Sequence, residues 1–549
     1  MEFHTVNKLQ KEALKKSATD LTRLGFALFF MIGVLTFSFL KNGGISNNMF
    51  LAVAALIGAY MAMNIGANDV ANNVGPAVGS KALTLTTAII IAAVFEAAGA
   101  LIAGGEVVKT IKNGIIDISA FGGNADPFIW AMMAALLAAA LWLNFATMMK
   151  APVSTTHSIV GGVMGAGIAA AGFDIVNWST MGSIAASWVI SPILGGVIAA
   201  VFLFAIKKSI VFKDDKIEAA KIYVPIFVAI MSWAFVTYII LKGVKHIWPK
   251  ILQSLNALPM VSLEITKKPT FTVALTIGLI IAIFVYLLVK KRVNSNIMVL
   301  ENTRVSVNTL FTIPLIFAAA LLSFAHGAND VANAIGPLAA INDAVVNGGV
   351  SSSASIPLWV MGVGALGISL GLALYGPKLI KTVGSEITEL DQIRAFSIAM
   401  AASVTVILAS QLGLPVSSTH IAIGGVFGVG FLREWLHVKD ENNHTIEEDI
   451  GIIKDEQQNR DAYKAELKII EEKSEKTQYD YTRIVELYKL IANEKKIIKS
   501  TKKNIKKAKK VQYVRRDAIK KIVAAWLITV PAAGILAGLL YFTIKGIMI

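Results

Sequence analysis

The sequence predicts an all-α integral membrane protein, and two observations predict it: the overall composition and the recurrence of long apolar runs. Of the 549 residues, 55% are hydrophobic and only 16% are charged, and the mean hydropathy is +0.65. A soluble chain carries roughly a quarter charged residues. Runs of about 20 apolar residues recur, and a helix of that length crosses the hydrocarbon core of a bilayer.

Charge and cysteine content exclude several classes of function. The chain has no cysteine, which excludes disulfides, thiolate zinc sites and cysteine nucleophiles. The formal charge of +15 indicates basic loops kept on the cytoplasmic side of a membrane, so we expect no nucleic-acid partner.

The first apolar segment, Leu24–Leu40, follows five basic residues and ends in Lys-Asn-Gly-Gly instead of a small-residue cleavage site. We therefore expect a retained helix in the plasma membrane, or in the inner membrane of a bacterium, with a cytoplasmic N-terminus. We expect about 12–13 transmembrane segments in all, although hydropathy does not separate a full crossing from a re-entrant hairpin. The further segments are expected near residues 50–78, 83–105, 127–149, 153–172, 176–206, 222–242, 271–290, 309–340, 357–377, 394–412, 415–432 and 521–545.

Basic clusters orient these segments. The clusters at 207–208 and 290–292 and the basic stretch that ends at 521 fall on one side if every segment crosses. The lysines between 242 and 268 fall on the other side, a conflict that an interfacial helix around Trp248–Leu258 would explain. This topology leaves the C-terminus outside.

An internal repeat organises the chain. Gly66–Pro76 reads GANDVANNVGP and Gly327–Pro337 reads GANDVANAIGP; Pro152–Gly167 reads PVSTTHSIVGGVMGAG and Pro415–Gly430 reads PVSSTHIAIGGVFGVG. The copies are 261 residues apart for the first motif and 263 for the second, which indicates a duplicated half. The first half starts outside and the second inside, so we predict two inverted repeats. Interrupted helices and re-entrant hairpins in inverted repeats are typical of secondary transporters with a binding site near the bilayer midplane.

Six regions follow from this repeat. Residues 433–520 are rich in Lys, Glu, Asn, Gln and Tyr at helical spacing, and their role as a solvated inside signal or as a lipid, partner or regulatory contact stays open. The predicted regions are an N-terminus with an extra helix (1–48), the first repeat (49–206), connecting helices (207–308), the second repeat (309–432), a cytoplasmic charged helical insertion (433–520) and a final helix (521–549).

The first repeated motif places acids inside apolar helices, and an ionisable residue at that depth marks an ion or substrate path. Asp69 and Asp330, with Asn72 and Asn333 one turn on, offer hard oxygen ligands for Na⁺, or a carboxylate that carries a proton. The Gly-Pro step that ends each copy is expected to break the helix. Glu96 is a further buried acid and a candidate cation ligand. Polar helix packing is the alternative reading.

The second repeated motif offers donors for an anion. Pro152 and Pro415 suit the first turn of a helix. Hydroxyls and free N–H groups at a helix start form a partly positive pocket for an oxyanion, although hydroxyl caps are also common without a ligand. These hydroxyls belong to Ser154, Thr155, Thr156, Ser417, Ser418 and Thr419. His157 and His420 follow, and we expect them to orient each hairpin by hydrogen bonding, with proton coupling as the alternative.

Both motif pairs, with WLNFATMMKAPVSTTH and GPKLIKTVGSEI around them, resemble the signatures of the inorganic phosphate transporter (PiT) family, which includes sodium–phosphate symporters. The resemblance covers roughly residues 50–432 and the last helix. It implies a transport core with a scaffold, a homodimer, no cofactor, and inorganic phosphate moved with Na⁺ or, in some members, H⁺. Carried over by motif, the aspartates and Asn72 and Asn333 would bind the cation, and the hydroxyls would bind phosphate with Asn68 and Asn329. Met132 and Ala399 stand where animal relatives carry glutamates.

Sulfate permease activity is the main alternative within that family. Phosphate near neutral pH usually keeps a proton that sulfate lacks, so a buried acceptor such as Asp69 or Asp330 favours phosphate, because an unpaired acceptor costs ~1–3 kcal/mol. A sensor is favoured only by the insertion, and no nucleophile–base pair or HExxH motif favours an enzyme. Paired inverted sites suit alternating access better than a channel.

Overall fold

The computed structural model describes residues 2–549 apart from 46–47, 122–124, 150, 152, 246, 259–263, 298–299, 348–355, 387–389, 441 and 509–515. Its regular secondary structure is helical throughout this part of the chain, with a single isolated bridge between Ile116 and Val176. The chain divides into two compact units: residues 1–429 with 516–549 (unit 1) and residues 430–515 (unit 2). The predicted all-α class is confirmed.

Eleven helices in the described residues are long and apolar enough to cross a membrane, so the chain is a multi-pass membrane protein. The two expected segments that fail this test are those of the second motif, whose helices are α6 (Thr155–Ala171) and α15 (Ser418–Asp440). The eleven are contained in α1 (Glu2–Lys41), α2 (Asn48–Gly79), α3 (Leu85–Ala103), α5 (Ala125–Met148), α7 (Trp178–Ile206, continued to Val211), α8 (Lys216–Tyr238, continued to Gly243), α10 (Phe271–Ile297), α12 (Thr312–Asn347), α13 (Leu358–Glu386), α14 (Gln392–Gln411) and α18 (Arg516–Met548).

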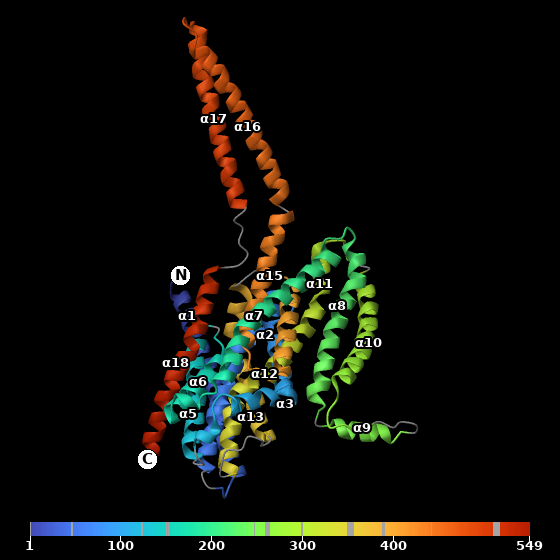
Figure 1. Ribbon diagram of the computed structural model, residues 1–549, viewed down its shortest axis with the longest axis vertical. Helices are drawn as coiled ribbons and strands as arrows, with labels where there is room; N and C mark the ends of the chain where they lie inside the picture. The colour runs from blue at the N-terminus through green and yellow to red at the C-terminus, as the bar shows by residue number, and fades with distance from the viewer. Residues whose placement is uncertain are drawn as a thin grey trace. The chain divides into compact units, whose positions relative to one another are not determined.

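Helices α2 and α12 carry the first motif and form the centre of unit 1 (Figure 1). Both continue through the Gly-Pro step, to Gly79 and Asn347, so the expected break is not present. A transmembrane helix tolerates a proline because neighbouring groups satisfy the freed backbone. Since Pro76 and Pro337 lack an N–H, the carbonyls of the residues four positions earlier, Asn72 and Asn333, lose their helical partner.

The second motif forms the tips of two helical hairpins, α5–α6 and α14–α15. The tips reach Asp69 in α2 and Asp330 near the middle of α12, as expected of re-entrant hairpins. Small residues let flanking helices approach closely. A Cβ added to Gly165 of α6 would lie 2.2 Å from the Gly534 carbonyl of α18, and one added to Gly428 of α15 would lie 2.0 Å from the Gly196 carbonyl of α7. Helix α18 therefore packs on α6 as α7 packs on α15.

Contacts between the halves are reciprocal, as an approximate two-fold relation requires. A Cβ on Gly66 of α2 would lie 2.0 Å from the carbonyl of Ile368 in α13, and a Cβ on Gly327 of α12 would lie 2.1 Å from the carbonyl of Glu96 in α3. Gly66 and Gly327 hold the same place in the two copies of the first motif. Ile368 is therefore the counterpart of Glu96. The inverted orientation of the repeats in a membrane stays a prediction.

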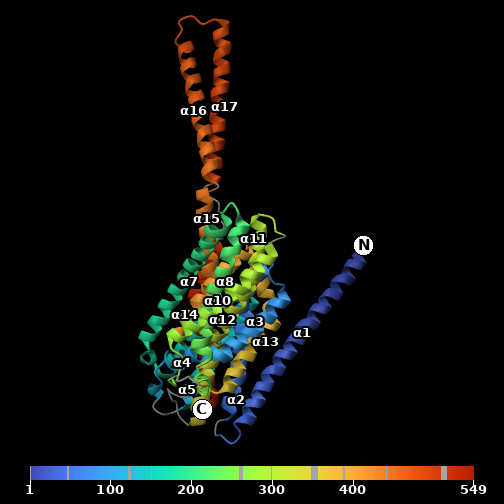
Figure 2. The ribbon, with the colours of Figure 1, turned by 90° about the vertical axis from the view of Figure 1, so that its right-hand side faces the viewer.

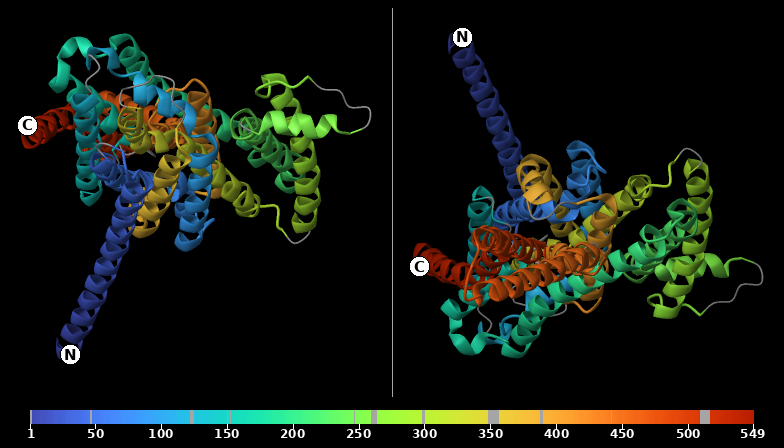
Figure 3. Two further views of the ribbon diagram at one scale, coloured as in Figure 1. Left: turned by 90° about the horizontal axis from the view of Figure 1, so that it is seen from below. Right: turned by 90° about the horizontal axis from the view of Figure 1, so that it is seen from above.

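Two additions surround the repeats in unit 1. Helix α1 packs mainly on α2, and its N-terminal end splays away from the bundle (Figure 2). Helices α8 and α10 pair at one side of the bundle, joined through α9 (Trp248–Asn256) (Figure 3). Helix α9 lies within the segment where the sequence predicts an interfacial helix.

Unit 2 is an antiparallel helical hairpin of α16 (Asn442–Glu471) and α17 (Gln478–Ala508). Its small core contains Leu467, Ile470, Leu487 and Ile491. At the turn, Lys473 donates to Asp480 at 2.7 Å, and this bond with those from Thr477 lowers the pKa of Asp480 to about 2. Unit 2 spans nearly the same residues as the predicted insertion, and its two helices pack against each other.

Candidate functional site

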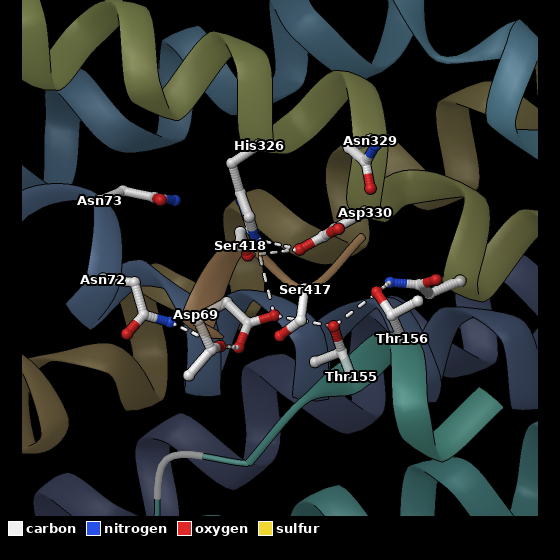
Figure 4. A network of polar contacts seen from close by, with 12 residues as sticks. Asp69, Asn72, Asn73, Thr155, Thr156, His326, Asn329, Asp330, Ser417 and Ser418 are labelled. Carbon is white, nitrogen blue, oxygen red and sulfur yellow. Dashed lines mark hydrogen bonds and ion pairs between the residues drawn. The ribbon is translucent and has the colours of Figure 1, made fainter. Parts of the chain in front are cut away.

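Two aspartates lie at the centre of unit 1, on either side of a histidine (Figure 4). Asp69, Asp330 and His326 are all completely buried. His326 Nε2 lies 2.8 Å from Asp330 Oδ2 and 3.6 Å from Asp69 Oδ2, and one ligand atom from each of the three residues falls within 4.8 Å of the others. Two buried carboxylates at this spacing favour a positive charge between them, because an unpaired buried charge is very costly.

Hydroxyls from both hairpin tips donate to these carboxylates. Thr155 Oγ1 donates to Asp69 Oδ2 at 2.9 Å, and Ser418 Oγ donates to Asp330 Oδ2 at 2.7 Å. These two bonds are counterparts in the two halves. Asp69 also accepts from the opposite half, because Thr419 Oγ1 lies 3.2 Å from its Oδ1. The acids and the hydroxyls that the sequence assigns to different ligands therefore form one network.

The asparagines one turn after the aspartates bind the hydroxyls of the other half. Asn72 Nδ2 donates to Thr419 Oγ1 at 2.8 Å, while Asn333 Nδ2 lies 3.2 Å from Oγ1 of both Thr155 and Thr156. The Oδ1 atom of Asn72 has no hydrogen-bond partner in the described part of the chain. This oxygen is therefore an unused acceptor within the network.

Asn68 and Asn329 hold the approach to each hairpin tip in the same way. Asn68 Nδ2 donates to Thr147 Oγ1 at 2.9 Å, and the Asn329 amide lies 2.9 Å from Ser410 Oγ. Both asparagines are completely buried. Each therefore links its motif helix to the end of the helix that leads into the hairpin tip.

Ser154 and Ser417 are caps of the helices that follow them. Ser154 Oγ accepts from the N–H of His157 at 3.1 Å, and Ser417 Oγ accepts from the N–H of His420 at 3.2 Å. Pro415 was expected in the first turn of its helix, and this prediction is wrong, because Pro415 precedes the first residue of α15 by three positions. Ser417 caps the helix instead. Pro152 lies outside the described residues.

Glu96 extends the site in the first half alone. Its Oε1 accepts from Asn73 Nδ2 at 2.7 Å, and its Oε2 lies 3.3 Å from His326 Nδ1. The counterparts of Glu96, Asn73 and His326 in the other half are Ile368, Ala334 and Ile65. Three polar residues on one side of the centre therefore correspond to three apolar residues on the other side, so the charges at the centre are not symmetric.

The sequence interpretation missed His326, although a signal was available. It stands directly before Gly327 of the second copy, where the first copy has Ile65. It also missed the buried ion pair in which Lys112 Nζ lies 3.0 Å from Asp343 Oδ2. Lys112 belongs to α4 (Gly105–Asn113).

Within the described residues, the hydrogen bonds expected of His157 and His420 do not reach ordinary hydrogen-bond geometry. Neither ring nitrogen of either residue has a hydrogen-bond partner in the described part of the chain. The two rings instead meet edge to face, with centroids 4.4 Å apart, and each packs on a tryptophan: His157 on Trp188 and His420 on Trp526. The pair sits behind the hydroxyl tips as a packed aromatic cluster.

Residues 65–537 match the family described as the phosphate transporter family. The chain belongs to this family. The members of this family are phosphate transporters, so the protein is a phosphate transporter and not an enzyme. A protein of Helicobacter pylori strain J99 named as a phosphate permease is 48% identical, with 98% of each chain covered. A Thermococcus kodakarensis protein with the same description is 38% identical and covers 70% of this chain and 89% of its own length.

The fold is similar to that of a solved structure described as the sodium-dependent phosphate transporter. The TM-score is 0.67 at 30% identity, with 90% of this chain and 99% of the other covered. The Helicobacter relative aligns over nearly the full length of this phosphate transporter, so it includes counterparts of α1 and unit 2, whereas the archaeal relative covers a shorter part of the chain.

Proposed function

We propose that this phosphate transporter imports inorganic phosphate together with Na⁺, by alternating access around the buried network of Asp69 and Asp330. The observation that carries the proposal is the direct hydrogen bonding of the hairpin hydroxyls to the two acids. The name of the similar solved structure, a sodium-dependent phosphate transporter, supports the choice of cation.

The cation would bind at the acids. Asp69 and Asp330 bring carboxylate oxygens within a few ångströms of one another, and the Oδ1 of Asn72 is an unused acceptor. The carbonyls freed by Pro76 and Pro337 lie on the same turns. Hard oxygens of this kind suit a small hard cation. We assign Asn333 to the same cation site, and Glu96 to its outer part through His326.

Phosphate would bind at the hairpin tips. Helices α6 and α15 both begin there, and the first N–H groups of a helix lack partners inside the helix. Each tip adds two hydroxyls after its capping serine: Thr155 and Thr156 in one, Ser418 and Thr419 in the other. Ser154, Ser417, Asn68 and Asn329 support these tips. Such donor-rich helix starts favour an oxyanion.

The network gives a physical reason for coupling. Thr155, Ser418 and Thr419 donate their hydroxyl protons to Asp69 and Asp330. A cation that binds these carboxylates takes up their lone pairs and releases the hydroxyls to donate to the anion. Phosphate binding then depends on prior or simultaneous Na⁺ binding, and the bound cations offset the charge of the anion in a low-dielectric site.

Uptake of radiolabelled phosphate into proteoliposomes tests the proposal. We expect uptake with an inward Na⁺ gradient, none without a gradient, and no competition from excess sulfate. Uptake driven by a H⁺ gradient alone would show that the coupling ion is H⁺ instead of Na⁺. Competition by sulfate would favour a sulfate permease.

Cellular placement and assembly are part of the proposal. We infer a plasma-membrane location, with a cytoplasmic N-terminus and unit 2 in the cytoplasm, from the basic residues that precede the apolar parts of α1 and α18. We also propose a homodimer, which the family resemblance implies.

A further inference from the structure

A cavity of about 780 Å³ lies between α1, α2, α5 and α13 of unit 1. Apolar residues of α1, among them Leu24, Leu28 and Met31, form its outer wall. Its inner wall carries polar side chains of α2 and α5, including Asn64, Asn144 and Thr147. The polar side chains of the cavity therefore all belong to the bundle, where they lie among apolar ones, and α1 contributes apolar side chains alone.

The polar wall connects the cavity to the buried motif. Asn144 Nδ2 donates to Asn64 Oδ1 at 3.3 Å. Thr147, at the end of the same helix face, accepts from Asn68 Nδ2 at 2.9 Å. Asn68 directly precedes Asp69, and its own Oδ1 has no hydrogen-bond partner in the described part of the chain. Two hydrogen-bonded pairs of amides and hydroxyls thus lie between the cavity and the helix turn that carries Asp69.

One end of the cavity is basic. Lys378 lines it, and its Nζ lies 3.8 Å from Asp20 of α1, which also contacts Arg23 at 3.3 Å. Two cations face one acid here. Asp20 and Arg23 lie where the apolar part of α1 begins, so this end is on the side that the N-terminal charge predicts to be cytoplasmic.

The other half keeps the inner of these two hydrogen-bonded pairs, as Asn329 and Ser410, but lacks the outer pair. The counterparts of Asn64 and Asn144 are Ala325 and Ile407, which are 0% and 8% exposed. A second cavity of about 640 Å³ lies beside α12, between α8 and α10. The counterpart of Tyr60 is Leu321, which lines this second cavity. Only one of the two cavities therefore has a polar connection to the motif helices.

We propose that the cavity beneath α1 is the cytoplasmic vestibule for phosphate, in which a hydrated oxyanion is held by Asn64, Asn144 and Thr147 beside the hairpin tip before it leaves past the basic end. This inference rests on the proposed function for its ligand. The volume suits an anion that keeps part of its water, since one water occupies about 30 Å³. Helix α1 separates the vestibule from the surrounding lipid. An oxyanion cannot cross that lipid.

Cysteine accessibility tests this directly, because the chain has no native cysteine. Asn144→Cys and the matched control Ile407→Cys are each introduced into the full chain in membrane vesicles of known orientation. A membrane-impermeant maleimide is then added from one side. We expect Asn144→Cys to react from the cytoplasmic side at least about tenfold faster than Ile407→Cys, because thiol reactivity requires exposure to water.

Phosphate with Na⁺ is expected to slow the reaction of Asn144→Cys. Equal slow reaction of both variants, or reaction of Asn144→Cys only from the outside, would overturn the vestibule even if uptake is normal. Rapid cytoplasmic reaction that phosphate slows but sulfate does not would support it. Rapid reaction that phosphate leaves unchanged would instead contradict the substrate, and hence the proposed function, while the hydrated cavity stands.

A transport measurement shows whether phosphate passes through this cavity on its way across the membrane. Asn64→Ala with Asn144→Ile gives this half the residues of the other half. We expect the uptake rate to fall by about tenfold, because an apolar wall raises the cost of moving a charged, hydrated ion, while equilibrium binding of radiolabelled phosphate to the purified protein is retained. Unchanged uptake would overturn the proposal.

Discussion

Thr419 and Asp69 are 350 positions apart, and the hydroxyl of the first donates to the carboxylate of the second at 3.2 Å. The bond joins a hairpin tip of the second half to the motif helix of the first half. It therefore links a candidate phosphate donor to a candidate cation ligand across the boundary between the repeats. Under the proposed function, movement of one half against the other would break or remake this bond, and the two ligands would be coupled at the interface between the halves.

Replacement of either aspartate is expected to abolish Na⁺-coupled phosphate uptake. Asp69→Asn and Asp330→Asn keep the shape of the side chain but remove the negative charge that a cation needs. Uptake into proteoliposomes is measured beside the size-exclusion profile, which we expect to stay unchanged. Asp117→Asn, at an exposed acid outside the network, is the control. Normal Na⁺-dependent uptake by both variants would refute the assignment.

Thr419→Val is expected to weaken the binding of both phosphate and Na⁺. The change removes one donor to Asp69 and the acceptor of Asn72, and a hydrogen bond to a charged group contributes ~1.5–3 kcal/mol. We expect KM for phosphate and the Na⁺ concentration for half-maximal uptake each to rise by about tenfold. Ser403→Ala, which loses a buried bond to its own helix, is the control; a rise in KM for phosphate alone would separate the two sites.

The Glu96–His326 pair is expected to be coupled in stability. Glu96→Ile and His326→Ile introduce the residues of the other half one at a time, and each leaves a buried polar group without its partner. A broken buried pair costs about 3–5 kcal/mol, whereas apolar replacement of both partners is often nearly neutral. Thermal unfolding in detergent should therefore show two strongly destabilised single variants and a double variant whose loss is clearly smaller than their sum, although Asn73 and Asp330 still lose a partner in it. Additive losses would contradict the coupling.

Unit 2 is expected to be dispensable for transport, because every residue of the candidate site lies in unit 1. Leu487 is completely buried in the hairpin core, so Leu487→Asp should unfold α16 and α17, since a buried charge without a partner is very costly. Hydrogen exchange over residues 442–508 should become fast while phosphate uptake stays near the wild-type rate. Lost uptake with an intact unit 1 would assign unit 2 a regulatory role.

Much of the site could be predicted from the sequence because the repeat marks it. Asp69, Asp330 and the hydroxyls of Thr155 and Ser418 stand in duplicated motifs, and the structure brings them into one network. His326 stands out in the sequence where the first copy has Ile65, but its contact with Glu96 could not be predicted, since Glu96 approaches from α3. The continuity of α2 through Pro76 also depends on packing, because a central buried helix is held by its neighbours.

Phosphate-stimulated influx of radioactive sodium into proteoliposomes, measured in parallel with radiolabelled phosphate, tests the central claim most directly. We expect phosphate to stimulate sodium influx in the wild type, with a constant ratio between the two fluxes, and to have no effect in Asp69→Asn. Phosphate influx that proceeds without any sodium influx, in the wild type, would contradict the account.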